Sequence, residues 1–487
     1  MTRWIRTLAG VVLVLLGMTI GVLLGAGYAA ADSTGDSART TSSASVAERH
    51  TARTADRVTR RAERQTARAA KRAERQAASS QRRSLFDRPR EGGDRALVRV
   101  ERAPRPPART RAETPETPET PEPSPVRPVD RVGGVVLSLV MGLGHLVDGP
   151  PAVPADSTVT PRRSTLVVPV AGGRRVEANW YFPDSTTEPA GLIYLQHGFM
   201  ASAPMYGYTA AALAERTNSI VVAPSLSSNF FLRSAAWLGG TPMQVAVADL
   251  FVGNRDALTA SARAAAGHDV TLPTEVVLVG HSMGGSLVMG AARAMVDNGA
   301  AANLAGVVLL DAVDVNNAVP NGLQQLSGTN YRPVYDISSE RYVWNMYGKV
   351  GDELAAARPG EFTGVMLVGG RHVDAAQGRN QLLQQAQYLL TGRSQPSNVE
   401  AAMILATGWV GDMLTGAHTG IYGTPGQTLS IDTPAGAATA VALPFPSDDI
   451  IEATPFDAVL ATILNTLQSY FIYEPAARPV HARVATR

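Results

Sequence analysis

Short apolar runs rich in β-branched residues alternate with alanine-rich stretches between residues 160 and 395. The apolar runs lie at 165–170, 175–182, 191–196, 219–224, 275–280, 306–311, 332–337 and 364–369. This alternation is typical of a mostly parallel sheet with helices on both faces. The first two runs flank Gly172-Gly173, which predicts an antiparallel hairpin at the start. We therefore expect an α/β fold with one sheet of about eight strands.

The first 31 residues have the pattern of an export signal. Arg3 and Arg6 precede an uncharged apolar run at 8–24, and Ala29-Ala30-Ala31 matches the small-residue site of signal peptidase. The apolar run is close to the lower limit for spanning a bilayer. Cleavage and retention as an N-terminal anchor therefore both stay open, and the small residues favour cleavage. Both readings place the remainder in the cell envelope or outside the cell.

Residues 32–131 lack the apolar side chains of a folded core, with Phe86 as their one aromatic residue. Their first part is rich in Arg and Ala, and TPETPETPEPSP at 114–125 predicts an extended spacer. Basic residues outnumber acidic ones here, which suits an anionic envelope polymer or a membrane surface as partner. A solvated spacer without a partner is the alternative. Nucleic acid is disfavoured because the arginines are not interleaved with aromatic residues that could stack on bases, and because the chain resembles an exported one.

The rest of the chain divides by composition. Residues 132–159 connect the spacer to a predicted catalytic domain at 160–395, and 396–487 form a C-terminal extension packed on that domain, ending in a disordered tail. In the extension we expect a helix at 399–414 and a strand pair at 428–434 and 438–444. The net charge of +2 averages a basic spacer and an acidic body. The chain has no cysteine, which excludes disulfides, thiolate metal sites and a cysteine nucleophile.

The motif Gly280-His281-Ser282-Met283-Gly284-Gly285 follows the fifth apolar run and precedes an alanine-rich stretch. A serine protrudes from a strand-to-helix turn only when the turn is very tight, so small residues are needed two positions to either side. Gly280 and Gly284 occupy those positions. The N-terminal amides of the following helix favour a developing oxyanion. The motif therefore predicts Ser282 as a nucleophile.

These residues resemble the α/β-hydrolase superfamily over about 160–395. The serine motif is similar to the nucleophile elbow of lipases, cutinase-like polyester hydrolases and chlorophyllases, and the whole resembles an exported enzyme of actinobacterial type. The sequence Gln196-His197-Gly198-Phe199-Met200 is similar to the oxyanion loop of lipases. The resemblance implies that the amides of Phe199 and Met283 stabilise the oxyanion. We expect the His197 side chain to shape the loop and to have no catalytic role.

A serine nucleophile needs a histidine base held by an acid. The candidates for the base are His372, directly after the last predicted strand, and His418, in a glycine-rich loop. His372 is favoured because strand ends meet at the active edge of such a sheet, and its His-x-Asp pattern resembles chlorophyllases. For the acid, Asp311 is favoured because it directly follows the buried run GVVLL at 306–310. The alternatives for the acid are Asp314, Asp336 and Glu340.

Two aromatic segments follow the fourth and seventh predicted strands, near the expected mouth of the site. We expect some of their side chains to contact an apolar or bulky substrate, although aromatic residues are more often core. The candidates are Phe230, Phe231, Trp237, Tyr342 and Trp344, with Tyr347 in the second segment. No cofactor or metal is implied, because neither a phosphate-binding loop nor an HExxH pattern occurs.

The combined pattern predicts a serine esterase or lipase that forms an acyl-enzyme with a small ester or lipid-like molecule. The first alternative is an envelope acyltransferase with the same triad. An added alcohol or sugar that outcompetes water for the acyl group would reveal this activity. The second is a non-catalytic envelope protein that keeps the hydrolase fold. The intact motif, the matched histidine and the Ser-Asp-His order argue against the second alternative.

Overall fold

The computed structural model describes residues 133–135, 137–139, 141–142, 148–232, 234–458 and 460–462. The predicted signal at 1–31 and the spacer at 32–131 lie outside the described residues, as does most of the final tail. Among the helices that are described, none is both long and apolar enough to span a bilayer. The predicted domain limits stay predictions.

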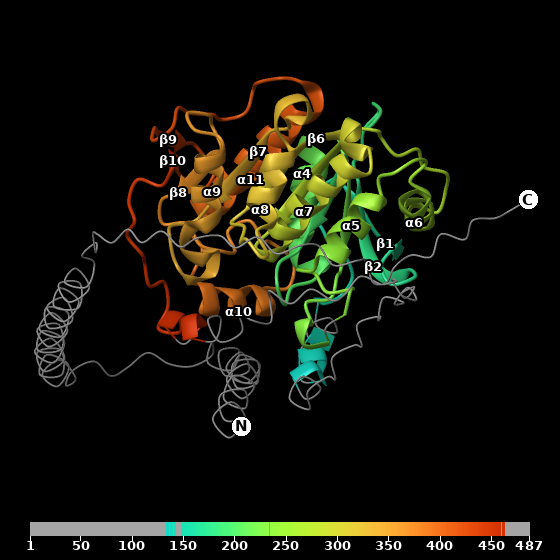
Figure 1. The fold of residues 1–487 in the computed structure, drawn as a ribbon, viewed down its shortest axis with the longest axis horizontal. Helices are drawn as coiled ribbons and strands as arrows, with labels where there is room; N and C mark the ends of the chain where they lie inside the picture. The colour runs from blue at the N-terminus through green and yellow to red at the C-terminus, as the bar shows by residue number, and fades with distance from the viewer. Residues whose placement is uncertain are drawn as a thin grey trace, which may run out of the picture. The chain divides into compact units, whose positions relative to one another are not determined.

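One sheet of ten strands runs through the described part of the chain, in the order β1-β2-β4-β3-β5-β6-β7-β8-β10-β9 (Figure 1). The strands are β1 (Thr160–Val168), β2 (Arg174–Phe182), β3 (Leu192–Gln196), β4 (Ile220–Pro224), β5 (Val276–His281), β6 (Leu304–Leu310), β7 (Val334–Ser338), β8 (Gly364–Leu367), β9 (Thr428–Ile431) and β10 (Ala438–Ala442). The six strands from β4 to β8 along the sheet are parallel. The expected α/β fold with a mostly parallel sheet is confirmed.

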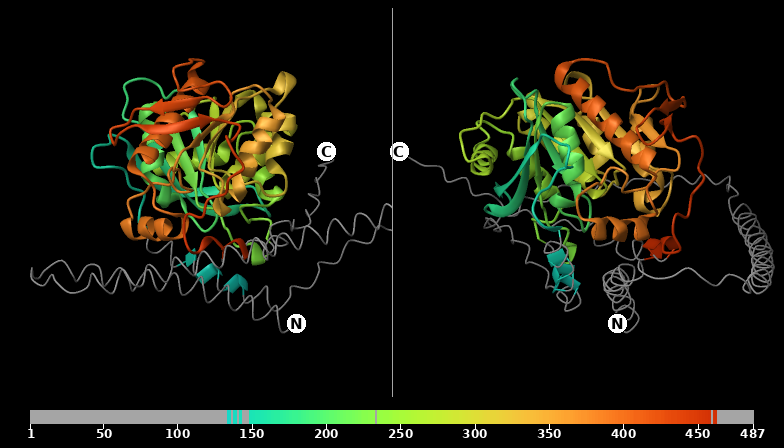
Figure 2. Two further views of the ribbon diagram at one scale, coloured as in Figure 1. Left: turned by 90° about the vertical axis from the view of Figure 1, so that its left-hand side faces the viewer. Right: turned by 180° about the vertical axis from the view of Figure 1, so that it is seen from behind.

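Helices cover both faces of this sheet (Figures 1 and 2). They are α4 (Gly207–Arg216), α5 (Thr241–Asp249), α6 (Asp256–Ala266), α7 (Met283–Asp297), α8 (Ala318–Gln325), α9 (Lys349–Ala357), α10 (Gln381–Thr391) and α11 (Pro396–Thr415). Helix α7 packs between α5 and α8 on one face, while α11 packs beside α4 on the other. Within β5, Val276 and Leu278 join the first hydrophobic core and Val277 and Val279 join the second. The strand is apolar throughout because both of its faces are buried.

The sheet is two strands longer than the sequence pattern predicted. The segment after α11 forms the β9–β10 hairpin, and β10 pairs antiparallel with β8. Its turn contains Gly436 at φ 107°, a backbone conformation that favours glycine. These strands are short and come late in the chain, so periodicity alone does not show that they continue the main sheet. Helix α11 covers the expected 399–414 and is buried against β5, β6 and β7.

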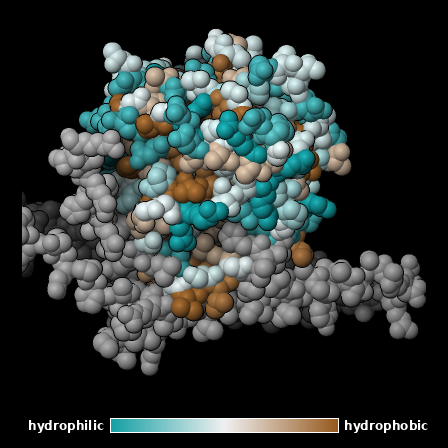
Figure 3. Space-filling model, turned by 90° about the vertical axis from the view of Figure 1, so that its right-hand side faces the viewer, coloured by the Kyte–Doolittle hydropathy of each residue, from teal (hydrophilic) through white to brown (hydrophobic). Residues whose placement is uncertain are grey.

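Strand β1 forms one edge of the sheet. It pairs antiparallel with β2 around Gly172 and Gly173, as the sequence predicted. Arg162 and Arg163 are exposed on this strand, and charged side chains on an edge discourage pairing with another chain. The face on the side of β1, β2 and α6 is mostly hydrophilic, with hydrophobic residues in small separate patches (Figure 3).

Candidate active site

Ser282 lies in the turn between β5 and α7, at the carboxyl end of the central strands. Its backbone has φ 54° and ψ −124°, a strained conformation for a residue with a side chain. A side chain at Gly284 would place Cβ 2.4 Å from the Gln196 carbonyl oxygen, and one at Gly280 would lie 2.5 Å from the Gly284 carbonyl oxygen. Both glycines are therefore required by close backbone approach, which is the property that the motif predicted.

The loop after β3 lies directly against Ser282. A Cβ built on Gly198 would be 2.8 Å from Ser282 Cβ and 3.3 Å from Ser282 Oγ. This loop continues to Phe199, and Met283 is the first residue of α7, whose N-terminal amides lack partners within the helix. The two segments that carry Phe199 and Met283 therefore meet at the serine.

His197 holds this loop in place. Its Nε2 accepts a hydrogen bond from the Leu226 amide at 2.9 Å, so Nδ1 carries the proton and donates to the Gly198 carbonyl at 2.8 Å. The next anchor along the loop is the Met200 amide, which donates to Ser228 Oγ at 3.0 Å. The His197 side chain is buried and has both ring nitrogens engaged in shaping the loop, in the role that the sequence suggested.

Asp311 follows β6 and is buried beside the serine turn. The Ser282 amide donates to the carbonyl of Leu310, the residue before Asp311, at 3.1 Å. Ser339 donates to Asp311 Oδ1 from its amide and from its hydroxyl, both at 2.8 Å, and Asn345 Nδ2 donates to the same oxygen at 3.2 Å. Burial alone would raise the pKa of Asp311, but the hydrogen bonds and charge of its partners, His372 foremost, hold that pKa below its usual range.

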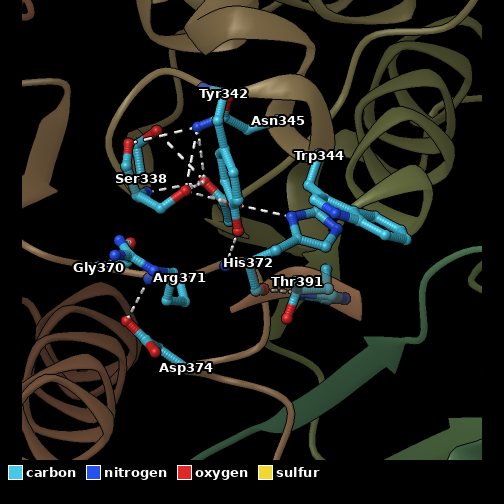
Figure 4. Close-up of polar contacts among 12 residues, drawn as sticks. Ser338, Tyr342, Trp344, Asn345, Gly370, Arg371, His372, Asp374 and Thr391 are labelled. Carbon is cyan, nitrogen blue, oxygen red and sulfur yellow. Dashed lines mark hydrogen bonds and ion pairs between the residues drawn. The ribbon is translucent and has the colours of Figure 1, made fainter. Parts of the chain in front are cut away.

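His372 follows β8, and its Nδ1 lies 2.6 Å from Asp311 Oδ2. Because the carboxylate accepts, Nδ1 carries the proton and Nε2 is the ring nitrogen left to accept one. The His372 amide donates to the Tyr342 hydroxyl, and its carbonyl lies 2.6 Å from His281 Nε2. Figure 4 shows the Trp344 ring beside the imidazole of His372. The centres of these two rings are 5.7 Å apart.

The serine turn and the histidine loop are in contact through His281, the residue before Ser282. The ring centres of His281 and His372 are 4.7 Å apart. Ser282, Asp311 and His372 therefore occupy one buried place at the carboxyl edge of the sheet, with exposed fractions of 8%, 4% and 4%. A serine, a base with a free ring nitrogen and a buried carboxylate are the components of nucleophilic catalysis.

The alternative base and acids lie elsewhere. His418 is exposed and stacks on Tyr422, at 4.1 Å between ring centres, in the segment after α11. Asp314 pairs with Lys349 Nζ at 2.5 Å, and Glu340 pairs with Arg371 at 3.5 Å. Asp336 is buried within β7, where burial, followed by the charge of Asp311, raises its pKa well above the usual range.

The predicted aromatic contacts separate into two groups. Phe230 lies 5.8 Å from the Phe199 ring of the oxyanion loop and 4.4 Å from Phe231, and both are buried, with 3% and 6% of their surface exposed. Trp344 is half-buried and lies against His372. Trp237 and Tyr342 have 1% and 0% of their surface exposed. Trp237 packs against Gly239 and Gly240 in the core, and Tyr342 supports the histidine loop.

Several polar residues of the site were not singled out from the sequence. Ser339 and Asn345 hold Asp311, and Tyr206 and His281 contact the oxyanion and histidine loops. His281 is part of the serine motif, and Ser339 and Asn345 lie in the segment that was noted for its aromatic residues and for Glu340. Nothing in the sequence pattern near Tyr206 indicates its contact with His281, because 75 residues separate the two.

The model of the alpha/beta hydrolase family matches residues 192–461. This match covers more than half of the chain and includes the serine turn, Asp311 and His372. The chain belongs to the alpha/beta hydrolase family. No curated protein sequence matches it.

Among solved structures, the chain is similar to an esterase from the archaeon Pyrobaculum calidifontis, with 15% identity and a TM-score of 0.35 over 53% of this chain and 90% of that one. It is similar to a bacterial brefeldin A esterase, with 13% identity and a TM-score of 0.40 over 61% and 89%. A thermostable esterase from Pseudomonas putida has 13% identity and a TM-score of 0.37 over 59% and 92%. These similarities are low, and nothing about substrate follows from them.

Proposed function

We propose that this protein is a serine hydrolase that cleaves carboxylic esters through an acyl-enzyme, with Ser282 as nucleophile, His372 as base and Asp311 as acid. The observation that carries the proposal is the 2.6 Å hydrogen bond from His372 Nδ1 to Asp311 Oδ2 beside the strained turn of Ser282. It fixes the tautomer that leaves Nε2 to accept a proton. Membership of the alpha/beta hydrolase family supports hydrolysis as the reaction class.

The reaction follows from these positions. Ser282 Oγ attacks the ester carbonyl while its proton passes to His372 Nε2, and Asp311 stabilises the resulting imidazolium. The amides of Phe199 and Met283 receive the oxyanion. Collapse of the tetrahedral intermediate breaks the bond to the alcohol oxygen, which takes the proton from His372. Water then attacks the acyl-enzyme with His372 again as base. The bond between the acyl carbon and Ser282 Oγ breaks as Oγ takes the proton back from His372, and the carboxylic acid is released.

The side chains near the serine favour an apolar substrate. Phe230 and Phe231 lie on the side of the oxyanion loop, and Trp344 lies on the side of His372. Apolar walls with few polar groups are typical of sites for small apolar ligands. This arrangement supports an ester with an aliphatic or aromatic acyl group, in keeping with the resemblance to lipases, cutinase-like polyester hydrolases and chlorophyllases.

Hydrolysis of p-nitrophenyl esters across acyl lengths tests the proposal. We expect turnover by the wild type, loss of turnover in Ser282→Ala, and loss of at least about 10³-fold in His372→Ala. His418→Ala is the matched control, because this histidine lies in the segment after α11 and stacks on Tyr422. Undiminished turnover in Ser282→Ala would overturn the mechanism, and loss in His418→Ala alone would overturn the choice of histidine.

We further propose that the protein is exported and that its basic segment at 32–131 binds an anionic envelope surface. The support is the sequence pattern of the first 31 residues and the arginine content that follows. Mass spectrometry of the N-terminus in each cell fraction tests export, with a mature start at residue 32 as the expected result. An intact N-terminus found only in the cytosol would contradict it. Binding of the full chain to anionic vesicles, compared with that of a chain that lacks residues 32–131, tests whether the basic segment binds an anionic surface.

A further inference from the structure

The histidine before the nucleophile, His281, is buried and has a partner at each ring nitrogen. Its Nε2 lies 2.6 Å from the carbonyl oxygen of His372, and its Nδ1 lies 2.7 Å from the hydroxyl oxygen of Tyr206. Tyr206 ends the 3₁₀ turn Ala203–Tyr206, which precedes α4. The imidazole of His281 therefore connects an element on one face of the sheet with the loop that carries the proposed base.

The direction of each hydrogen bond follows from the chemistry of the partners. A carbonyl oxygen only accepts, so His281 Nε2 carries the proton and donates to His372. A neutral imidazole has one N–H, so Nδ1 accepts the proton of the Tyr206 hydroxyl. The Tyr206 oxygen also accepts from the Gly198 amide at 3.2 Å. These hydrogen bonds form a continuous series from the Gly198 amide through Tyr206 and His281 to the His372 carbonyl.

The charges around His281 agree with a neutral ring. Burial, and next the charge of His372, lower the pKa of His281 to about 3, and they outweigh the hydrogen bond to the His372 carbonyl and the charge of Asp311, which both raise it. Burial likewise raises the pKa of the Tyr206 hydroxyl, which keeps its proton. The ring of His281 therefore adds no positive charge beside His372 when the latter takes the serine proton.

The main chain of His372 is thus held from both sides. Its amide donates to the Tyr342 hydroxyl and its carbonyl accepts from His281. The Gly198 end of the series fixes the loop that lies against Ser282. An error of 1 Å in the placement of catalytic groups costs about 100-fold in rate, so such supports affect catalysis without touching substrate.

We propose that His281 and Tyr206 are positioning residues, which set His372 and the oxyanion loop in register with Ser282. This inference rests on the proposed ester hydrolysis. It adds a function for the histidine of the serine motif that is distinct from packing. Neither residue takes part in proton transfer.

Kinetics of four variants test the inference. We expect kcat to fall roughly 10-fold in Tyr206→Phe and roughly 10- to 100-fold in His281→Leu, with KM within about twofold of the wild type. His281→Gln keeps one N–H donor and one acceptor, so it should retain more activity than His281→Leu. Tyr422→Phe is the matched control, because it removes a tyrosine hydroxyl that follows α11 and donates to Asp412 in that helix at 2.8 Å. Wild-type kcat in folded Tyr206→Phe and His281→Leu would overturn the inference.

Histidine NMR of the ¹⁵N-labelled full chain gives a readout that does not need turnover. We expect His281 as the neutral Nε2–H tautomer from pH 5 to 8, and we expect the His372 Nδ1 proton to shift in Tyr206→Phe but not in Tyr422→Phe. An Nδ1–H tautomer or titration of His281 in this range would overturn the inference, even where the variants do not fold. Absence of turnover in the wild type, with His281 as expected, would instead overturn the proposed function.

Discussion

Asp311 and His372 are joined by a 2.6 Å hydrogen bond although the strands that they follow, β6 and β8, are not neighbours in the sheet. Strand β7 lies between them, and Ser338 and Ser339 at its carboxyl end donate to Asp311. Asp311, the proposed acid, is therefore held by the strand that separates it from His372, the proposed base. A carboxylate with several donors stays ionised in a buried site, because the hydrogen bonds offset its desolvation.

Replacing Asp311 with asparagine should lower kcat by about 10³- to 10⁴-fold with little change in KM, because an amide does not fix the Nδ1–H tautomer of His372. The measurement is p-nitrophenyl ester hydrolysis. Asp314→Asn is the control, since this carboxylate lies three residues away and pairs with Lys349. A larger loss in Asp314→Asn than in Asp311→Asn would show that the acid has been assigned wrongly.

Gly284→Ala should lower stability by about 1–3 kcal/mol and also reduce turnover, because its Cβ would lie 2.4 Å from the Gln196 carbonyl oxygen. The matched control is Gly411→Ala in α11, where a Cβ meets nothing within 4 Å. That change should raise stability by about 0.5–1 kcal/mol through helix propensity. Urea unfolding measures the free energy of unfolding of both variants. Equal changes in this free energy for Gly284→Ala and Gly411→Ala would contradict the close approach at the serine turn.

Asp374, two residues after His372, should make stability depend on pH. Burial, only partly offset by hydrogen bonds, raises its pKa from 3.8 to about 7. The folded state then binds this proton more tightly than the unfolded chain does, so the stabilisation is complete below about pH 4 and is lost as pH rises through 7. Asp374→Asn should remove this dependence and be more stable than the wild type at pH 8. Urea unfolding at pH 5 and pH 8 measures the free energy of unfolding of both proteins. If the difference between the two pH values is the same in Asp374→Asn as in the wild type, the raised pKa of Asp374 is refuted.

Trp344 should link the imidazole of His372 to α10. Its ring lies 5.7 Å from His372, and its Nε1 donates to the Leu390 carbonyl at 3.1 Å. Trp344→Ala should lower kcat roughly 10-fold and raise KM for long acyl groups, because both contacts are lost. Trp344→Phe keeps a ring but not the N–H donor, so faster hydrogen exchange in α10 with a smaller loss of kcat is expected. Identical kinetics in the two variants would mean that the ring does not matter to His372.

Much of the fold follows from local pattern. Each apolar run that was predicted as a strand overlaps one in the structure. The central strands, such as β5, are buried on both faces and must therefore be apolar along their length. The serine turn is equally local, since Gly280 and Gly284 stand at fixed distances along the chain from Ser282. The position of the β9–β10 hairpin beside β8 does not follow from the local sequence pattern, because a sheet edge can accept a strand from any part of the chain.

The sequence by itself determined the alternation of strands and helices and the glycines that Ser282 requires, because periodicity and backbone sterics act over a few residues. Only the tertiary structure decided that Asp311 rather than Asp314 meets His372, and that His418 lies elsewhere. It also decided that Tyr206 meets His281 across 75 residues. Hydrogen bonds between loops depend on the order of strands in the sheet, and that order arises only when the core packs.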